Sequence, residues 1–215
     1  VELSNLPRQT LYTESDVAEA WPKAEAAARH LRAINSSCEL IPRVLHVSPE
    51  NIESLIVGAD CVLDGSDNFE LRYLLNDAAV KHGIPWVYAG VLGTEAVTMA
   101  VLPGQTPCLR CLFEEAPGAG LAPSCETFGV LGTSVGLIAN LQATEALKIL
   151  WREPESLHGK LLSVDPVLGR FSALDVSASR NEGCPACARG EFTWLDRRQS
   201  RSEERRVGKE CRSRW

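Results

Sequence analysis

The amino-acid sequence predicts an α/β domain built on an open, mostly parallel sheet that ends in an antiparallel portion. Two observations predict this fold class. Strand-like segments alternate with helix-like segments along the chain, and two apolar strands are separated only by Leu92, Gly93 and Thr94. Alternation is typical of parallel sheets, whereas strands joined by short turns pair in antiparallel fashion. With 215 residues, 45% of them hydrophobic and 23% charged, the chain can bury one sizeable core.

The first half of the chain supplies the first alternation. Residues 23–35 are rich in Ala, Glu, Lys and Arg and follow Pro22, which favours a helix that starts at a proline. Residues 38–47 contain a predicted strand, and residues 49–58 a short helix. Residues 61–65 are predicted to form a strand that ends in a polar turn.

A second helix is predicted over residues 69–82, because Gly83 and Pro85 follow it and both residues terminate helices. The next two segments, residues 85–91 and 95–102, are apolar strands. They form the pair with the short connection.

A long helix is predicted over residues 133–151. Its residues are mostly apolar, which implies burial in the core or against a second subunit. Two final strands, at residues 160–166 and 170–176, complete the predicted sheet.

Composition argues against two classes of partner. The net charge of −6 argues against a nucleic-acid surface, which needs clustered Lys and Arg. No apolar run reaches the ~18 residues that a membrane span requires, and no secretory signal is visible. We therefore expect no nucleic acid and no membrane as partners, and a cytoplasmic location.

Both ends of the chain differ from the rest. The chain starts at Val1 and its one methionine is Met99, so we expect that the start of translation lies elsewhere. Residues 201–215, RSEERRVGKECRSRW, contain nine charged residues without a helical or strand period. This string resembles the conceptual translation of a sequencing adapter. Without it the chain loses six basic and three acidic residues, and the net charge becomes −9.

A polar turn with the sequence DGSDN follows the apolar residues of the strand near residue 62. Open α/β sheets bind ligands at the carboxyl ends of their strands. Asp67 in this turn fits an N-cap of the following helix as well as a metal or phosphate site. The position alone leaves both roles open, and one side chain can have both.

Four of the eight cysteines form two Cys-x-x-Cys pairs, Cys108 with Cys111 and Cys184 with Cys187. Such a pair forms a turn that points two thiolates at one ion, and two pairs make the tetrahedral four-sulfur set that Zn²⁺ prefers. Disulfides are the alternative, but a domain of this size without a secretory signal favours zinc. With four protein ligands the zinc would be structural, tying the end of the domain to its middle.

The other cysteines have weaker signals. Cys38 and Cys61 are most simply ordinary thiols. Cys125 lies in the Gly- and Pro-rich stretch PGAGLAPSCETFGV, which leads toward the long helix. A thiol near a helix N-terminus can become nucleophilic, although spacing alone favours an ordinary thiol here.

Several motifs together resemble, in order and spacing, the ThiF/MoeB/HesA family of ATP-dependent adenylyltransferases, which are bacterial relatives of ubiquitin-activating enzymes. The motifs are VELSNLPRQTLYTESD, PKAEAAARHLRAIN, VLDGSDNFELRYLLND, PCLRC, SCETFGV, LQATEALKIL and CPAC. The resemblance implies a Rossmann-like domain over residues 1–190, and leaves residues 191–200 as an extension and residues 201–215 as the adapter-like tail. It also implies a homodimer.

The resemblance implies a reaction as well. This is adenylation, with ATP and Mg²⁺, of the C-terminal glycine carboxylate of a ubiquitin-like sulfur-carrier protein that ends in Gly-Gly, in thiamine or molybdopterin sulfur transfer. By position, Arg8 and Lys23 match the family's phosphate-binding cations and Asp67 matches its Mg²⁺ carboxylate. Asn5 and Gln9 match residues in supporting polar roles.

Two further implications concern parts of the reaction. Cys125 aligns with a cysteine that in some members forms a thioester or acyl-disulfide link with the carrier, whereas other members lack this step. In the family, a first βαβ unit with a Gly-rich loop and a ribose-binding acidic residue precedes the segment that aligns with Val1. That unit is missing here, so we expect the fragment itself to be inactive.

Two other functions fit parts of the sequence. A noncatalytic, zinc-stapled module could bind ubiquitin-like tails without activating them, but it would not need Arg8, Lys23 and Asp67 together. A dehydrogenase on a similar sheet is a weaker alternative, because it would not explain the four cysteines.

Overall fold

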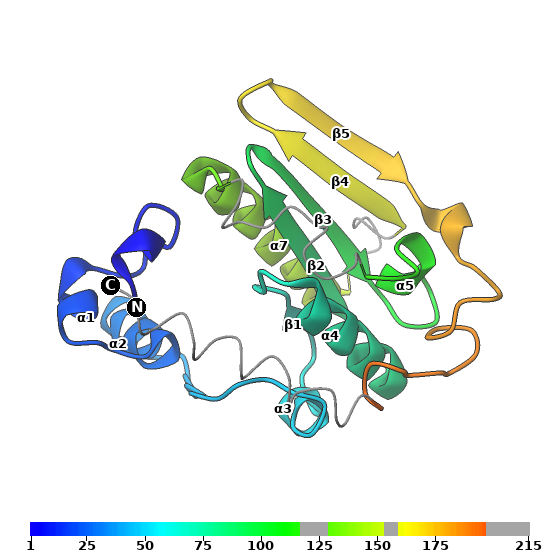
Figure 1. Ribbon diagram of the computed structural model, residues 1–215, viewed down its shortest axis with the longest axis horizontal. Coiled ribbons are helices and arrows are strands. Elements are labelled where there is room, and N and C mark those ends of the chain that lie inside the picture. Colours follow the sequence, from blue (N-terminus) through cyan, green and yellow to red (C-terminus); the bar gives the residue numbers. More distant parts are fainter. Residues whose placement is uncertain (117–128, 153–158, 197–215) are drawn as a thin grey trace, which may run out of the picture.

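The computed structural model describes residues 1–116, 129–152 and 159–196. Its centre is a five-stranded sheet in the order β1-β2-β3-β4-β5 (Figure 1). The strands are β1 (Val62–Leu63), β2 (Trp86–Leu92), β3 (Glu95–Val101), β4 (Lys160–Asp165) and β5 (Arg170–Asp175). Only β1 and β2 are parallel, and the other three pairings in the described chain are antiparallel.

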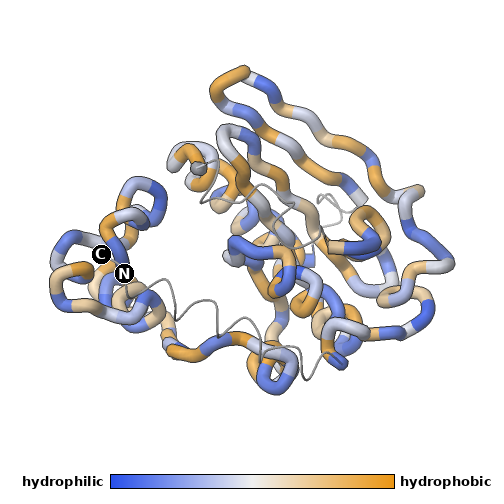
Figure 2. Tube along the Cα trace, viewed as in Figure 1, coloured by the Kyte–Doolittle hydropathy of each residue, from blue (hydrophilic) through white to orange (hydrophobic). Residues whose placement is uncertain are grey.

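The sheet corrects two predictions. It is mixed, as expected, but in the described residues it is mostly antiparallel, because the hairpins β2–β3 and β4–β5 reverse the chain direction. The predicted strand at residues 38–47 is also wrong. This segment, which runs from α2 (Lys23–Ile34) to α3 (Ile52–Ile56), pairs with no strand in the described residues, and it contains Pro42, which cannot donate a backbone hydrogen bond. Its Ile41, Val44 and Leu45 are exposed, and Figure 2 shows hydrophobic residues along this connection.

One face of the sheet is covered by the long helix α7 (Gly132–Trp151), which confirms the prediction of a long apolar helix. Successive strand residues point to opposite faces, and this face presents Ala96 and Val164. Both pack with Ile138 of α7 in a small buried cluster. The burial of this apolar surface holds α7 on the sheet.

The opposite face is covered by α4 (Phe69–His82), which lies in front of the sheet in Figure 1. Eight consecutive residues of α4, from Arg72 to Ala79, are buried, so the helix is enclosed on all sides. Its apolar members share the main core with Trp86, Tyr88 and Met99. Gly83 ends the helix at a φ of 66°, a left-handed conformation that favours glycine, as predicted.

The remaining helices are short except one. They are the 3-10 turns η1 (Leu3–Asn5) and η2 (Ser177–Ser179) and the α-helices α1 (Glu14–Ala18), α2 (Lys23–Ile34), α3 (Ile52–Ile56) and α5 (Leu109–Leu112). Sequence analysis predicted α2 and α3 but missed α1 and α5, which span only five and four residues. Within the described ranges, no helix is both long and apolar enough to cross a membrane.

Residues 1–35 form a helical unit that lies to one side of the sheet (Figure 1). We call it the N-terminal unit. Its buried carboxylate, on Asp16, accepts hydrogen bonds from Thr13 N and from His30 Nε2, both at 2.8 Å. Burial alone would raise the pKa of Asp16, but the hydrogen bonds from Thr13 and His30 lower it overall. A tight contact links the unit to α7: a Cβ built at Gly132 would lie 2.3 Å from the carbonyl oxygen of Pro7.

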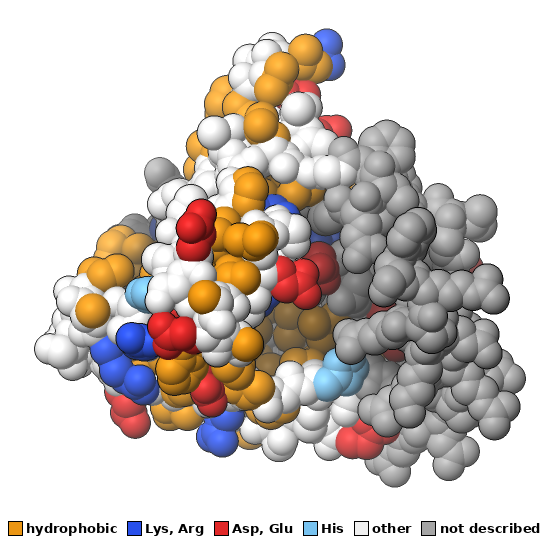
Figure 3. Space-filling view, turned by 60° about the vertical axis from the view of Figure 1, so that its left-hand side comes forward, with side chains coloured by type: hydrophobic (Ala, Val, Ile, Leu, Met, Phe, Trp, Pro, Cys, Tyr) orange, Lys and Arg blue, Asp and Glu red, His pale blue; other side chains and the backbone are white. Residues whose placement is uncertain are grey.

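The β4–β5 hairpin lies at the edge of the sheet away from β1 and carries apolar side chains at its surface (Figure 3). Val167, Leu168, Phe171 and Leu174 are all exposed. Strand β5 is an edge strand in the described sheet, so its outer backbone groups have no strand partner there.

Candidate functional site

A buried ion pair between Asp64 and Arg72 stabilises the turn after β1. Asp64 accepts a hydrogen bond from Ser66 N at 2.8 Å, and its Oδ2 lies 3.3 Å from Arg72 Nε. Arg72 Nη2 also donates to Ser66 O at 2.9 Å. Burial raises the pKa of Asp64, and the hydrogen bond from Ser66 and the charge of Arg72 oppose that rise. The conformation of the turn is therefore fixed by charged groups that are out of contact with solvent.

The turn presents Asp67 to solvent. The helix α4 is capped by Asn68, whose side-chain oxygen accepts from Leu71 N at 2.8 Å. The suggestion that Asp67 is this cap is therefore wrong. In the described chain, the Asp67 carboxylate accepts only a 3.4 Å hydrogen bond from Asn68 Nδ2. A carboxylate in this state is free to bind a cation.

Two elements tie this turn to the rest of the domain. Gln142 of α7 donates through Nε2 to the carbonyl oxygens of Asp64 and Val87, both at 2.8 Å. The guanidinium of Arg72 lies 5.5 Å from the Phe69 ring centroid and 5.4 Å from that of Tyr88, within the range of cation–π contacts. Sequence analysis missed Arg72 and Gln142. The available signal was a polar side chain on an otherwise buried helix face.

The cluster Asn5, Arg8 and Gln9 is brought together by η1 and the turn after it. Asn5 is buried, its Oδ1 accepts from Glu2 N at 3.1 Å, and its carbonyl oxygen accepts from the backbone N–H groups of Arg8 and Gln9. Arg8 Nη1 donates to Ser4 O at 2.6 Å. Gln9 Oε1 is buried without a hydrogen-bond partner in the described residues. These hydrogen bonds fix the conformation of the cluster, and Gln9 Oε1 is left as an acceptor without a donor in the described residues.

Lys23 belongs to the same N-terminal unit as this cluster, and no hydrogen bond or ion pair in the described residues joins it to Asp67. It is the exposed first residue of α2, and its carbonyl oxygen accepts from Tyr12 Oη at 3.2 Å. Within residues 1–116, no hydrogen bond or ion pair connects Arg8 or Lys23 with Asp67. The structure therefore groups the N-terminal candidates and leaves the candidate Mg²⁺ carboxylate on a separate turn (Figure 1).

The four predicted metal ligands converge. The Sγ atoms of Cys108, Cys111, Cys184 and Cys187 all lie within 4.8 Å of one another. The closest pairs are Cys111 with Cys187 at 3.3 Å and Cys108 with Cys184 at 3.6 Å. A tetrahedral Zn²⁺ with Zn–S bonds of about 2.3 Å sets sulfur atoms about 3.8 Å apart, so the four residues fit a metal ion.

No disulfide joins these four cysteines in the structure: all four are free, and their sulfur separations exceed the about 2.05 Å of an S–S bond. The hydrogen bond between Cys108 and Cys111 raises the pKa of Cys108 and lowers that of Cys111. Burial raises the pKa of Cys187 as well.

Cys125 lies outside the described residues, as do the adapter-like residues 201–215.

Comparison with known proteins identifies close relatives. The chain is 42% identical over 195 residues to the sulfur carrier protein ThiS adenylyltransferase of Bacillus subtilis, covering 91% of this chain and 57% of that protein. It is 42% identical over 190 residues to the SAMP-activating enzyme E1 of Haloferax volcanii, covering 88% of this chain and 68% of that protein. The chain therefore spans little more than half the length of the first relative.

Solved structures support the fold. The crystal structure of E. coli MccB with MccA-N7isoASN matches with a TM-score of 0.71 at 23% identity, and the match covers 87% of this chain and 57% of that chain. At this identity the likeness shows the fold alone. The family assignment comes from the sequence: residues 1–186 match the ThiF family, so the chain belongs to that family.

Proposed function

We propose that the complete protein adenylates the C-terminal glycine carboxylate of a ubiquitin-like sulfur-carrier protein that ends in Gly-Gly. The relatives named above activate the sulfur carrier ThiS or SAMP proteins, which supports this class of substrate. The observation that carries the proposal is the exposed Asp67 carboxylate, held on a turn that Arg72 and Gln142 anchor from the protein interior.

In the proposed reaction, a carboxylate oxygen of the carrier attacks the α-phosphorus of ATP. The new acyl-phosphate bond forms as the bond to pyrophosphate breaks. Both reactants are anionic, so Arg8 and Lys23 would offset the charge that accumulates around the phosphorus. Asn5 and the open acceptor of Gln9 would support the nucleotide. Mg²⁺ held by Asp67 would neutralise phosphate oxygens.

A further part of the proposal concerns the exposed surface around β1. Strand β1 is an edge of the described sheet, and Val57 and Leu63 near it are exposed, as are Ile41, Val44 and Leu45 of the α2–α3 segment. An unpaired edge beside apolar side chains is a surface that proteins usually cover. We propose that a first βαβ unit with the Gly-rich loop covers it in the complete protein, and that the present chain is inactive alone.

The proposal is tested by ATP–pyrophosphate exchange in the complete protein. Asp67→Asn should lower the exchange rate by about 100-fold or more, because it removes the charge that holds the cation. Glu70→Gln is the matched control, since Glu70 is an exposed acid in the first turn of α4. A wild-type rate in Asp67→Asn would overturn the assignment. Carrier binding that ignores ATP would instead indicate a noncatalytic binding module.

We also propose that the four cysteines hold a structural Zn²⁺. The chemistry of four thiolates at these separations suits Zn²⁺, and four protein ligands would leave no open position for substrate. The ion would join the segment around Cys184 to the segment around Cys108, which are 76 residues apart.

Three further proposals concern the oligomeric state of the protein, its location and the role of Cys125. A second copy would cover the outer face of α7, where Leu147, Leu150 and Trp151 are exposed, and the protein would act in the cytoplasm. Light scattering on the complete protein measures the first, and a monomer mass would reject it. Cys125 is proposed as the residue that could link covalently to the carrier. Mass spectrometry of the carrier–enzyme mixture tests that link.

A further inference from the structure

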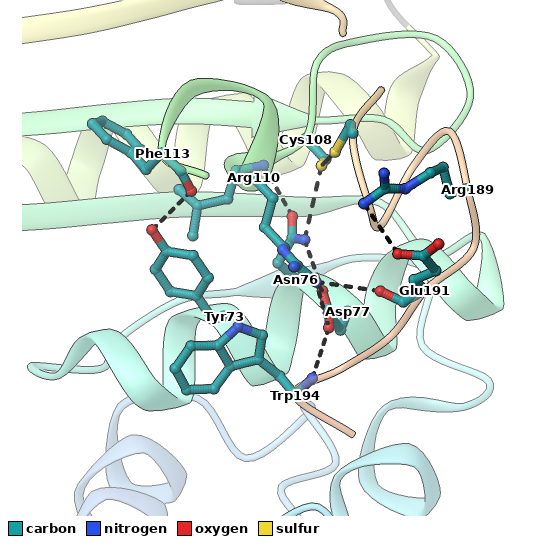
Figure 4. Close-up of polar contacts among 11 residues, drawn as sticks. Tyr73, Asn76, Asp77, Cys108, Arg110, Phe113, Arg189, Glu191 and Trp194 are labelled. Carbon is teal, nitrogen blue, oxygen red and sulfur yellow. Dashed lines mark hydrogen bonds and ion pairs between the residues drawn. The ribbon is translucent and has the colours of Figure 1, made fainter. Parts of the chain in front are cut away.

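The buried amide of Asn76 contacts Cys108, a member of the four-cysteine cluster (Figure 4). Asn76 lies in the middle of α4 and is 0% exposed. Its Oδ1 accepts from Leu109 N at 2.9 Å, and its Nδ2 lies 3.8 Å from Cys108 Sγ. Leu109 is the first residue of α5, the short helix that Cys108 precedes as its N-cap residue and that contains Cys111. One side chain therefore contacts both the backbone and a sulfur of the first cysteine pair.

The next residue of α4 holds the segment that follows the second cysteine pair. Asp77 is 3.1 Å from Arg110 Nη1, which lies between Cys108 and Cys111, and its Oδ2 also accepts from Trp194 N at 3.1 Å. Arg110 Nη1 donates in turn to Glu191 O at 3.3 Å. These contacts connect α4, the first cysteine pair and the chain beyond Cys187 without using any cysteine side chain.

The Asn76 amide places a hydrogen-bond donor next to a cysteine sulfur, and the contacts of Asp77 and Arg110 described above do not. Four thiolates around a divalent cation carry a net negative charge, and hydrogen bonds to sulfur stabilise it. The Nδ2 group of Asn76 is a neutral donor next to Cys108, which is itself buried. A side chain that served only packing could be apolar there. An amide with both ends engaged instead fixes the position of Cys108 and faces its sulfur with a donor.

We propose that Asn76 is a positioning residue of the metal site: it orients the Cys108–Cys111 turn and donates an N–H···S hydrogen bond to the Cys108 thiolate. The inference rests on the proposed binding of a metal by the four cysteines. It adds a residue outside the ligand set that determines how tightly the ion is held.

The test uses the 215-residue chain titrated with Co²⁺ and Zn²⁺. Asn76→Asp keeps an oxygen acceptor for Leu109 N but replaces the donor beside sulfur with a negative charge. Asn76→Leu removes both groups at similar volume. We expect both variants to bind Zn²⁺ about 10- to 100-fold more weakly in chelator competition, and the thiolate-to-Co²⁺ absorption band of each to shift. Asn140→Asp is the control, because Asn140 is an exposed amide on α7.

A second measurement on the wild-type chain removes dependence on how the variants fold. In nitrogen-15 NMR spectra, Zn²⁺ should shift the side-chain amide resonances of Asn76 and leave those of Asn140 unchanged. Wild-type affinity and absorption in both Asn76 variants, or Asn76 resonances that do not respond to Zn²⁺, would overturn the inference while leaving the metal site intact. A wild-type chain that binds neither ion would overturn the metal site itself, and this inference with it.

Discussion

The four-cysteine end of the domain and the N-terminal unit differ in how completely their candidate sites are built. At the four-cysteine end, ligands from two distant segments converge within 4.8 Å, and buried polar groups of α4 support them. In the N-terminal unit, Arg8 contacts the backbone of its own turn and Lys23 is exposed. The first site is organised in advance by core contacts, whereas the second consists of surface side chains with few fixed contacts in the described residues.

The largest expected effect is the loss of metal after removal of one thiolate. Cys184→Ser should reduce bound zinc from about one ion per chain to background, because a hydroxyl replaces a buried thiolate in a four-sulfur site. Elemental analysis of the purified chain measures this content. Cys38→Ser is the matched control, since Cys38 is an exposed free thiol. Equal zinc content in the two variants would show that the ion is not held by these cysteines.

The second largest effect is expected on the free energy of unfolding, when the buried ion pair between Arg110 and Asp77 is broken. Arg110→Met should lower the free energy of unfolding by about 3–5 kcal/mol, because it leaves the Asp77 carboxylate buried without its cation. Burial already raises the pKa of Asp77 against the opposing charge of Arg110. Denaturant unfolding measures the change.

The control for that experiment is an ion pair at the surface. In the pair Arg189–Glu191 both side chains are 52% exposed, and Arg189→Met should cost no more than about 1 kcal/mol. Similar costs for Arg110→Met and Arg189→Met would show that the buried ion pair contributes no more to stability than the exposed one at the same end of the domain.

The smallest effect on stability is expected in the N-terminal unit. Arg8→Ala and Lys23→Ala should each change the free energy of unfolding of this chain by about 0.5 kcal/mol or less, since Arg8 is only partly buried and Lys23 is exposed. The same substitutions should be far more harmful to exchange activity in the complete protein. A stability cost of several kcal/mol would mean that these residues are structural, and would weaken their assignment to phosphate binding.

Local signals in the sequence predicted most of the fold. The helix at residues 69–82 matches α4, because its glycine stop and helical pattern are both local. The strand at residues 38–47 could not be excluded in this way, since a strand depends on a partner elsewhere in the chain. The sheet direction was misjudged for a related reason: alternation of elements suggested parallel strands, but the short connections between later strands decide their pairing.

The same distinction applies to the candidate sites. The cysteine spacing predicted a four-sulfur cluster because each pair is local and its chemistry is specific. Asn76, Asp77 and Arg110 were not predicted, because their roles arise from contacts 32 or more residues apart along the chain. The position of Asp67 at a strand end left its role open between cap and ligand, and the family resemblance favoured the Mg²⁺ role. The structure assigns the cap to Asn68, and the Mg²⁺ role of Asp67 stays a prediction.

The close approach of Pro7 to α7 depends on the lack of a side chain at Gly132. A methyl group at position 132 would clash with Pro7. It would lie 2.3 Å from the backbone carbonyl oxygen of Pro7, which cannot rotate aside, and 3.5 Å from the Cα of Arg8. Alanine there would force the N-terminal unit away from the start of the long helix and would carry the Arg8 guanidinium with it. The absence of a side chain at Gly132 therefore determines how closely Arg8 approaches the start of α7.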